Sequence, residues 1–448
     1  MKPNILLLVI DSLRSDQFQN AEKTSITPNI DSLVKNGTYF SQAISSADGT
    51  IVSLNTIING LFPNSIGTRE LRIKLKKENL VSTLIQNNYH FYGFLPNLTS
   101  FQSLIKLCEN EDPTYDPGPP TIPLEKTGSQ ILKLLNSKNL SEPWFYFLHI
   151  FDLHAIREGS MPTGLENFDT EKFGSTKYEK IVSSIDYWIG KILEKIDLTN
   201  TIVIITADHG EKIPIDEKDC VSFEPPLTTG KEIGKKLLPK SAQNIGGKSL
   251  SKLRKSIAAV RIANANRNLT HYEKRSRLPH FTLSLFDENI KIPLLINGPK
   301  INKKIITQQV GAVDIFPTIL NILELESNTK FDGVSLLPLI NGRIFPENPI
   351  YIHTMPHQKI SENDCVGIRT SKYKYFRHAR IPTQNVHLFD LINDTFENDN
   401  INYKFPDIVK NFEMTLSGFP ESDFSDTEDK TTDDDLKISN ELKKLGYI

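Results

Sequence analysis

The chain has 448 residues, of which 38% are hydrophobic and 24% charged, and its formal net charge is −2. This length can bury a large core, and the natural expectation is one large α/β domain with a smaller one. The near-neutral charge gives no general attraction to nucleic acid or to a membrane surface, and the three widely spaced cysteines imply neither a disulfide framework nor a zinc cluster. No apolar run reaches about 18 residues, so we expect no transmembrane segment and a cytoplasmic location.

The N-terminal segment is predicted to be a buried strand over residues 5–10 that delivers Asp11 at its carboxyl end. The apolar run could pass for a signal peptide, but it is short and lacks a small-residue cleavage site. A capped helix is predicted over 27–37, and another begins at Thr50, with apolar positions 51, 54, 57 and 58 on one face. Thr50 either binds an anion at the helix N-terminus or only caps the helix.

Two further segments are predicted to be buried strands that end in polar residues, namely 144–154, which ends in His154, and 201–206. The second is apolar or β-branched throughout, which is typical of a parallel strand buried on both faces. Asp208 and His209 follow it, at the strand end where open α/β sheets bind ligands. A carboxylate beside an imidazole suits a divalent metal. The alternative is that Asp208 caps a helix and His209 is an ordinary loop residue.

The regular alternation stops after residue 211 and returns at His280, which marks residues 212–279 as an insertion. Between residues 231 and 277 there are thirteen basic residues and two acidic ones. Such a run is either a solvated face or a patch that contacts an anionic substrate or a membrane surface.

The pattern changes again near residue 345. A strand at 292–298 and a helix at 311–323 continue the α/β pattern, and short strands are then expected at 351–353, 366–369 and 373–376. These predict a small antiparallel subdomain. A turn-rich segment at 388–394, an acidic flexible segment at 421–435 and a last helix at 436–445 follow. We therefore expect a catalytic α/β domain over 1–345 and a C-terminal subdomain over 346–448.

We predict a site for one divalent metal ion, formed by residues at strand ends and at a helix start, namely Asp11, Thr50, Asp208 and His209. The Thr50 hydroxyl would be both a metal ligand and a nucleophile. A free threonine hydroxyl is a poor nucleophile, and a metal ion or a base must activate it.

An ordered set of short motifs carries a family resemblance, and it spans nearly the whole chain apart from the insertion. The matching segments are 3–16, 27–33, 207–211, 292–296, 313–318, 332–339, 372–375 and 388–391. In this order they resemble the sulfatase family of the alkaline phosphatase superfamily. The resemblance implies a mostly parallel central sheet flanked by helices, and one divalent ion of Mn, Mg, Ca or Zn. It also implies that His154 and His280 bind the transferring group or protonate the leaving oxygen. The substrate would be an anionic ester, with a glycan or a glycolipid among the candidates.

Two departures from the family pattern bear on the chemistry. The nucleophile position falls on Thr50, where sulfatases carry the Cys or Ser that is oxidised to formylglycine, and Ser12 replaces a second carboxylate found in many arylsulfatases. A threonine resembles the nucleophile of phosphoglycerol and phosphoethanolamine transferases of the same superfamily. Formylglycine releases sulfate when the C–O bond of its hydrated aldehyde breaks, and a threonine sulfate has no aldehyde that allows this. A phosphothreonine can be cleaved by in-line attack at phosphorus, so phosphoester chemistry is favoured. The alternative function is a catalytically silent protein that binds an anionic glycan or lipid through the basic insertion.

Overall fold

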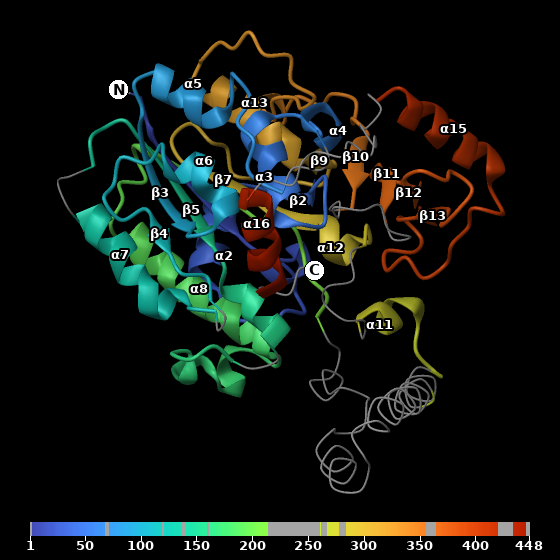
Figure 1. Cartoon of the computed structure of the whole chain (residues 1–448), viewed down its shortest axis with the longest axis horizontal. Helices are drawn as coiled ribbons and strands as arrows, with labels where there is room; N and C mark the ends of the chain where they lie inside the picture. Colours follow the sequence, from blue (N-terminus) through green and yellow to red (C-terminus); the bar gives the residue numbers. More distant parts are fainter. Residues whose placement is uncertain are drawn as a thin grey trace, which may run out of the picture. The chain divides into compact units, whose positions relative to one another are not determined.

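The computed structural model describes residues 2–67, 71–118, 121–136, 140–158, 161–213, 260, 267–276, 284–354, 364–419 and 433–444. The chain divides into two compact units, one formed by residues 1–211 with 280–448 and the other by 212–279 (Figure 1). The second unit includes helix α11, His271–Ser276. Within the described ranges, no helix is both long and apolar enough to cross a membrane.

The first unit is built around a nine-stranded sheet in the order β4-β3-β5-β1-β6-β7-β2-β8, with β9 also pairing with β2. The strands are β1 Asn4–Ile10, β2 Thr38–Ile44, β3 His90–Pro96, β4 Thr114–Tyr115, β5 Trp144–Ile150, β6 Thr201–Thr206, β7 Lys291–Asn297, β8 Lys304–Ile306 and β9 Val310–Gly311. Pairing is parallel except where β7 joins β6 and β2, so β7 runs against the other strands. The predicted mostly parallel sheet is confirmed.

The three central strands explain why their sequences show no polar alternation. Every residue of β1, β5 and β6 is buried. β1 lies between the other two in parallel register, with Val9 opposite His149 on one side and Thr206 on the other. Their carboxyl ends therefore meet at one edge of the sheet, which is where polar residues follow each strand.

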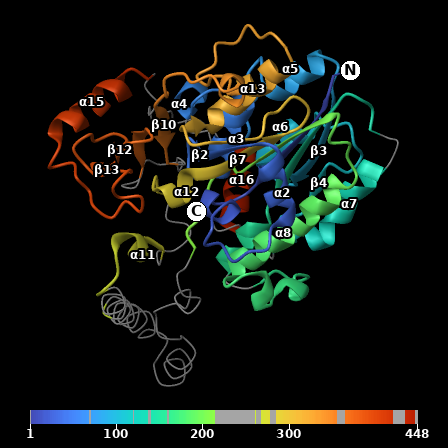
Figure 2. The ribbon, with the colours of Figure 1, turned by 180° about the vertical axis from the view of Figure 1, so that it is seen from behind.

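Helices cover both faces of this sheet, with α2, α7 and α8 on one side and α3, α5 and α13 on the other (Figures 1 and 2). The described helices of the first unit are α1 Ser15–Phe18, α2 Pro28–Asn36, α3 Thr50–Asn59, α4 Pro63–Ile66, α5 Leu80–Gln86, α6 Gln102–Ile105, α7 Leu124–Asn136, α8 Lys177–Leu193, α12 Asp287–Ile290, α13 Ile315–Ile322, α14 Leu337–Ile340, α15 Pro406–Ser417 and α16 Asp433–Lys444. The short 3₁₀ helices are η1 Thr99–Phe101, η2 Asp152–Glu158, η3 Glu166–Phe168, η4 Glu171–Phe173 and η6 Ala312–Asp314. Helix α8 is the longest of them, and a capping box between Thr176 and Glu179 fixes its start.

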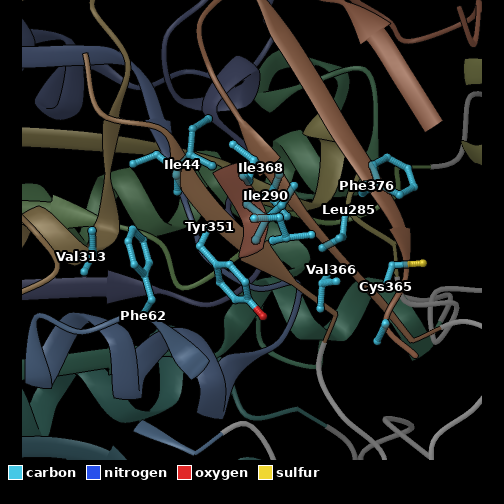
Figure 3. Close-up of a cluster of buried hydrophobic side chains, with 14 of the residues drawn as sticks. Ile44, Phe62, Leu285, Ile290, Val313, Tyr351, Cys365, Val366, Ile368 and Phe376 are labelled. Atoms are coloured by element: carbon cyan, nitrogen blue, oxygen red, sulfur yellow. The ribbon is translucent and has the colours of Figure 1, made fainter. Parts of the chain in front are cut away.

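A second, antiparallel sheet follows in the order β10-β11-β12-β13, with β10 Ile350–His353, β11 Cys365–Arg369, β12 Tyr373–His378 and β13 His387–Asp390. It shares a hydrophobic cluster with the central sheet, in which Ile44 of β2 packs with Ile368 and Phe376 (Figure 3). The predicted antiparallel C-terminal sheet is confirmed, and the domain boundary at residues 345–346 stays a prediction.

A buried ionic cluster also joins this sheet to α12. Lys374 Nζ lies 2.7 Å from Asp287 Oδ1 and 2.6 Å from Glu397 Oε1, and Arg369 forms a second ion pair with Asp287 at 2.7 Å. The Lys374 side chain is fully buried. Because a buried ammonium is costly without partners, these contacts are needed to hold the charge in place.

Three details of the sequence prediction need correction. Residues 387–390 form β13, although the segment from 388 looked turn-rich, because its backbone pairs with β12. The helix predicted at 311–323 begins only at Ile315, after β9 and η6. The residues of α3 are buried on all sides and not only on one face, and the polar ones are satisfied internally, as when Asn59 donates to the Asn55 carbonyl.

Candidate metal centre and nucleophile

Four residues predicted for a metal site meet at one edge of the central sheet. Asp11 directly follows β1, Asp208 and His209 come just after β6, and Thr50 begins α3 a few residues beyond β2. Ligand atoms of Asp11, Asp208 and His209 lie within 4.8 Å of one another, and all three residues are buried. The Thr50 hydroxyl lies 3.0 Å from Asp11 Oδ2 and 3.3 Å from His209 Nε2. The structure thus brings together stretches of chain that are far apart in the sequence.

The turn after β1 holds the two carboxylates. Ser12 has a φ of 64°, in the left-handed region that non-glycine residues adopt only rarely. In this conformation its backbone N–H donates to Asp208 Oδ1 at 3.2 Å, and its hydroxyl donates to Asp11 Oδ1 at 2.7 Å. A single residue therefore contacts both carboxylates.

The His209 ring is oriented by its own backbone neighbour. Its Nδ1 lies 2.6 Å from the Gly210 carbonyl oxygen, to which it donates, so Nε2 is the nitrogen with a lone pair that faces Thr50. Gly210 is required here by close packing, because a Cβ at this position would lie 2.2 Å from the Glu288 carbonyl oxygen. The Asp-His-Gly sequence is thus explained by a ligand pair followed by a close backbone contact.

The charges of the site favour an ionised Asp11. Burial by itself would raise the pKa of Asp11, but the interaction with the nearby His154 ring and the electrostatic effect of the His209 and His149 rings hold this pKa well below its usual range. Asp11 is therefore available as an anionic ligand.

A divalent cation fits the donor atoms present. Asp208 Oδ2 is buried and accepts no hydrogen bond from any residue in the described part of the chain. A buried carboxylate oxygen without a partner is costly, and a bound cation would satisfy it. Two carboxylates, an imidazole nitrogen and a hydroxyl are a suitable ligand set for a divalent metal ion.

Thr50 occupies the first helical position of α3, and Gly49 takes the N-cap position with an extended backbone. The Thr50 hydroxyl points towards Asp11 and His209, so it does not act as a simple N-cap. The backbone N–H groups of the first helical turn lie beside it and favour an anion.

Histidines extend the site on the side of β5. His154 lies on η2 with Nδ1 3.8 Å from Asp11 Oδ1, and its ring stacks on Phe151 at a centroid distance of 4.3 Å. His280 lies outside the described residues. His149, which the sequence did not single out, is fully buried on β5 with Nε2 3.6 Å from Asp208 Oδ2. Its place near the end of a strand next to β1 was the signal that could have identified it.

The fold and these residues define a class of protein, an alkaline phosphatase-like α/β protein with a metal-ligand cluster at the strand ends and a hydroxyl at a helix start. The model of the Sulfatase family matches residues 3–325, so the chain belongs to the sulfatase family. A second family model, described as N-sulphoglucosamine sulphohydrolase, C-terminal, matches residues 280–418.

Individual proteins resemble parts or all of the chain. Arylsulfatase K of Mus musculus is 29% identical over 143 residues, which are 30% of this chain and 26% of that protein. Arylsulfatase K of Gallus gallus is 30% identical over 146 residues, which are 30% of this chain and 27% of that protein. The match thus spans about a quarter of the length of these relatives.

Solved structures match over most of the chain at low identity. Phosphonate monoester hydrolase of Agrobacterium radiobacter superimposes with a TM-score of 0.63 at 15% identity, covering 93% of this chain and 95% of that chain. A putative sulfatase from Bacteroides thetaiotaomicron gives a TM-score of 0.65 at 16% identity, covering 93% and 92%. A protein in complex with its substrate D-glucosamine-2-N,6-O-disulfate gives 0.61 at 13% identity, covering 96% and 100%. These likenesses establish the fold.

Proposed function

We propose that the protein is a metal-dependent hydrolase of phosphoric or sulfuric esters that uses Thr50 as its nucleophile, with phosphoesters favoured. The observation that carries the proposal is the position of the Thr50 hydroxyl between Asp11 Oδ2 and His209 Nε2 at the start of α3. Membership of the sulfatase family supports ester hydrolysis.

The metal would be held by Asp11, Asp208 and His209, with the Thr50 hydroxyl as a fourth ligand. A divalent ion bound there would neutralise charge on the transferring group and make the hydroxyl more acidic. The N-terminal N–H groups of α3 would bind the non-bridging oxygens of the ester.

In the proposed reaction the Thr50 hydroxyl gives up its proton to solvent, Oγ1 attacks phosphorus and the bond to the leaving alcohol breaks, while Asp11 Oδ2 and His209 Nε2 orient the hydroxyl oxygen. His154, or His280 as its proposed partner, protonates the leaving oxygen. Water then attacks the phosphothreonine at phosphorus, which releases phosphate and restores the hydroxyl.

Phosphate is favoured over sulfate by the chemistry of threonine. Formylglycine releases sulfate by breaking the C–O bond of a hydrated aldehyde, and threonine cannot form that aldehyde. A phosphothreonine needs no such route, because phosphorus accepts in-line attack by water.

The alcohol half of the substrate is proposed to be part of an anionic glycan or glycolipid. One structural neighbour was solved with a sulfated glucosamine. The basic insertion at 212–279 would contact such a substrate through the thirteen basic residues between positions 231 and 277, and a cytoplasmic location is proposed. The second function, a silent binding protein, is disfavoured by the complete set of Asp11, Thr50, Asp208 and His209.

The test compares Thr50→Val, Thr50→Ala and Thr50→Ser with a matched control, Thr56→Val. Thr56 lies on the same helix, is fully buried, and donates to the Val52 carbonyl oxygen. Activity is measured on paired aryl phosphate, phosphodiester and sulfate substrates. Thr50→Val and Thr50→Ala should lose several orders of magnitude in kcat, Thr50→Ser should keep part of it, and Thr56→Val should retain it in the folded fraction.

Mass analysis of quenched enzyme should show a phosphoryl adduct on Thr50. A Thr50→Ala variant that folds, binds metal and turns over phosphoesters at nearly the wild-type rate would refute the nucleophile. Activity confined to sulfate esters would refute the preference for phosphate.

A further inference from the structure

We infer that helix α16 is a strap that positions the active site from outside, and that Glu441 is the residue through which it does so. The inference rests on the metal centre of the proposed function and adds a means by which a distant helix controls it. Glu441 is a positioning residue, since it acts on the site only through other side chains.

The docking contact of α16 joins residues that are 342 positions apart in the sequence. The Glu441 carboxylate accepts from the Thr99 backbone N–H at 2.9 Å and from the Thr99 hydroxyl at 2.7 Å. Ile438 lies one turn earlier on the same helix face and is 1% exposed, whereas Leu436 and Asn440 are exposed. An apolar contact and two charge-assisted hydrogen bonds therefore hold α16 in place.

The docking partner, η1, lies at the sheet edge that carries the metal centre. It follows shortly after β3, which runs parallel to β5, and β5 in turn runs parallel to β1. Phe101, the last residue of η1, is 1% exposed, and its ring packs edge-on against the His149 ring at a centroid distance of 5.4 Å. Helix α16 thus docks on the turn that supports His149.

The His149 ring is held by packing and not by hydrogen bonds. Neither ring nitrogen has a hydrogen-bond partner among the residues that the structure describes. The ring neighbours are Phe101 and Phe151, the latter at a centroid distance of 6.3 Å. His149 Nε2 lies 3.6 Å from Asp208 Oδ2. A displacement of Phe101 would therefore move His149 against a proposed metal ligand.

The same turn also braces the helix of the nucleophile. The Ser100 carbonyl oxygen accepts from Ile73 N at 2.8 Å, and the next residue, Lys74, donates its N–H to Asn55 Oδ1 of α3 at 2.8 Å. Thr50 begins this helix. One 3₁₀ turn therefore connects α16 both to the surroundings of Asp208 and to α3.

The experiment breaks the docking contact from both sides in the full-length protein, with Glu441→Gln and Thr99→Val. Glutamine offers one acceptor oxygen in place of two, and valine lacks the hydroxyl. The controls are Asn440→Ala, which is exposed on α16, and Glu413→Gln, which weakens a carboxylate contact of α15 with Arg377 at 2.9 Å. Circular dichroism establishes that each variant is folded.

The probes are Mn²⁺, Mg²⁺, Ca²⁺ and Zn²⁺, added to metal-free protein in a calorimeter. The ion that wild type binds most tightly is then used for all variants, and kcat and KM are measured on an aryl phosphate. Glu441→Gln and Thr99→Val should each raise the Kd of this ion about 2- to 30-fold, the range for residues coupled to a site at a distance. They should lower kcat with little change in KM, and both controls should leave Kd and kcat unchanged.

Phe101→Leu tests the route of the coupling. Glu441→Gln should raise the Kd in the wild-type background but not in the Phe101→Leu background, because residues that act through one contact are not additive. The two docking variants decide the inference where Phe101→Leu does not fold.

An unchanged Kd in folded Glu441→Gln and Thr99→Val, or a rise of the same size in a control, overturns the strap and leaves the metal centre standing. Additive effects in the Phe101→Leu background overturn the route through His149. A wild type that binds none of the four ions overturns the metal centre of the proposed function, and the strap with it.

Discussion

Asp152 should make the protein less stable as the pH rises, and Asp152→Asn should remove this effect. Asp152 begins η2 and is 2% exposed, and its Oδ2 accepts a hydrogen bond from Leu124 N at 2.9 Å. Burial raises the pKa of Asp152 from 3.8 to about 7, and the backbone hydrogen bonds offset only part of the shift. A buried carboxyl group with one neighbouring donor is easier to keep protonated than ionised.

The sign follows from the raised pKa. The carboxyl group binds a proton more tightly in the folded state, so its contribution to stability is complete below pH 3.8 and is lost as the pH rises towards about 7. A shift of roughly three pKa units corresponds to at most about 4 kcal/mol, at 1.36 kcal/mol per unit. Asparagine stays neutral and can still accept from Leu124 N, so the variant should keep the hydrogen bond without this loss.

The assay is urea unfolding followed by circular dichroism at several pH values from about 4.5 to 8, in the range that the shift spans. Asp152→Asn should unfold near the wild-type urea midpoint at the lowest pH and at a clearly higher midpoint at the highest. Asp390→Asn is the control of opposite sign, because the hydrogen bond from Asn393 lowers the pKa of Asp390. A variant at Asp152 that gains nothing at high pH, or a control that gains as much, would show that the burial argument is wrong.

Two further predictions concern buried polar groups. Tyr178→Phe removes the hydroxyl that bonds to the Ser12 carbonyl oxygen and to Arg14 N, so it should lower the free energy of unfolding by about 1–3 kcal/mol and weaken metal binding. Urea unfolding measures the first effect and calorimetry the second. The control Tyr89→Phe, which removes a hydrogen bond to the Pro3 carbonyl oxygen, should affect only stability. Lys374→Met removes the cation that Asp287 and Glu397 share, so it should lower the free energy of unfolding by about 3–5 kcal/mol. The control Lys404→Met removes an exposed ion pair with Asp399 and should leave the urea midpoint nearly unchanged.

The fold is predictable from sequence where burial leaves a simple pattern. The strands β1, β5 and β6 are buried along their whole length, so their sequences are continuous apolar runs. Because parallel strands end at one edge, the residues that follow them can be grouped from the sequence alone. The order of strands and polar residues predicts that Asp11, Asp208 and His209 lie together, and the helix that Gly60 ends with a φ of 63° predicts Thr50 at a helix start.

Other features depend on contacts that the sequence does not encode locally. The positive φ of Ser12 is held by Tyr178, which lies 166 residues away in the sequence. The sequence alone therefore shows Ser12 only as the replacement of a carboxylate that many arylsulfatases have. His149 sits inside an apolar strand and becomes noticeable only when β5 is placed beside β1. β13 forms because β12 lies next to it, which overrides the turn-forming residues that follow.

The two departures from the arylsulfatase pattern meet at the same carboxylate. Ser12 donates to Asp11 Oδ1 and Thr50 donates to Asp11 Oδ2, at 2.7 and 3.0 Å. A carboxylate at position 12 would have no hydrogen to donate and would place a second negative charge beside Asp11. Serine removes that charge from the site, which reduces the repulsion of an anionic ester. The reduction matters more for a doubly charged phosphate monoester than for a singly charged sulfate ester, because Coulomb repulsion scales with the product of the charges. The replacement at position 12 therefore supports the proposed preference for phosphoesters by an electrostatic argument that does not depend on Thr50.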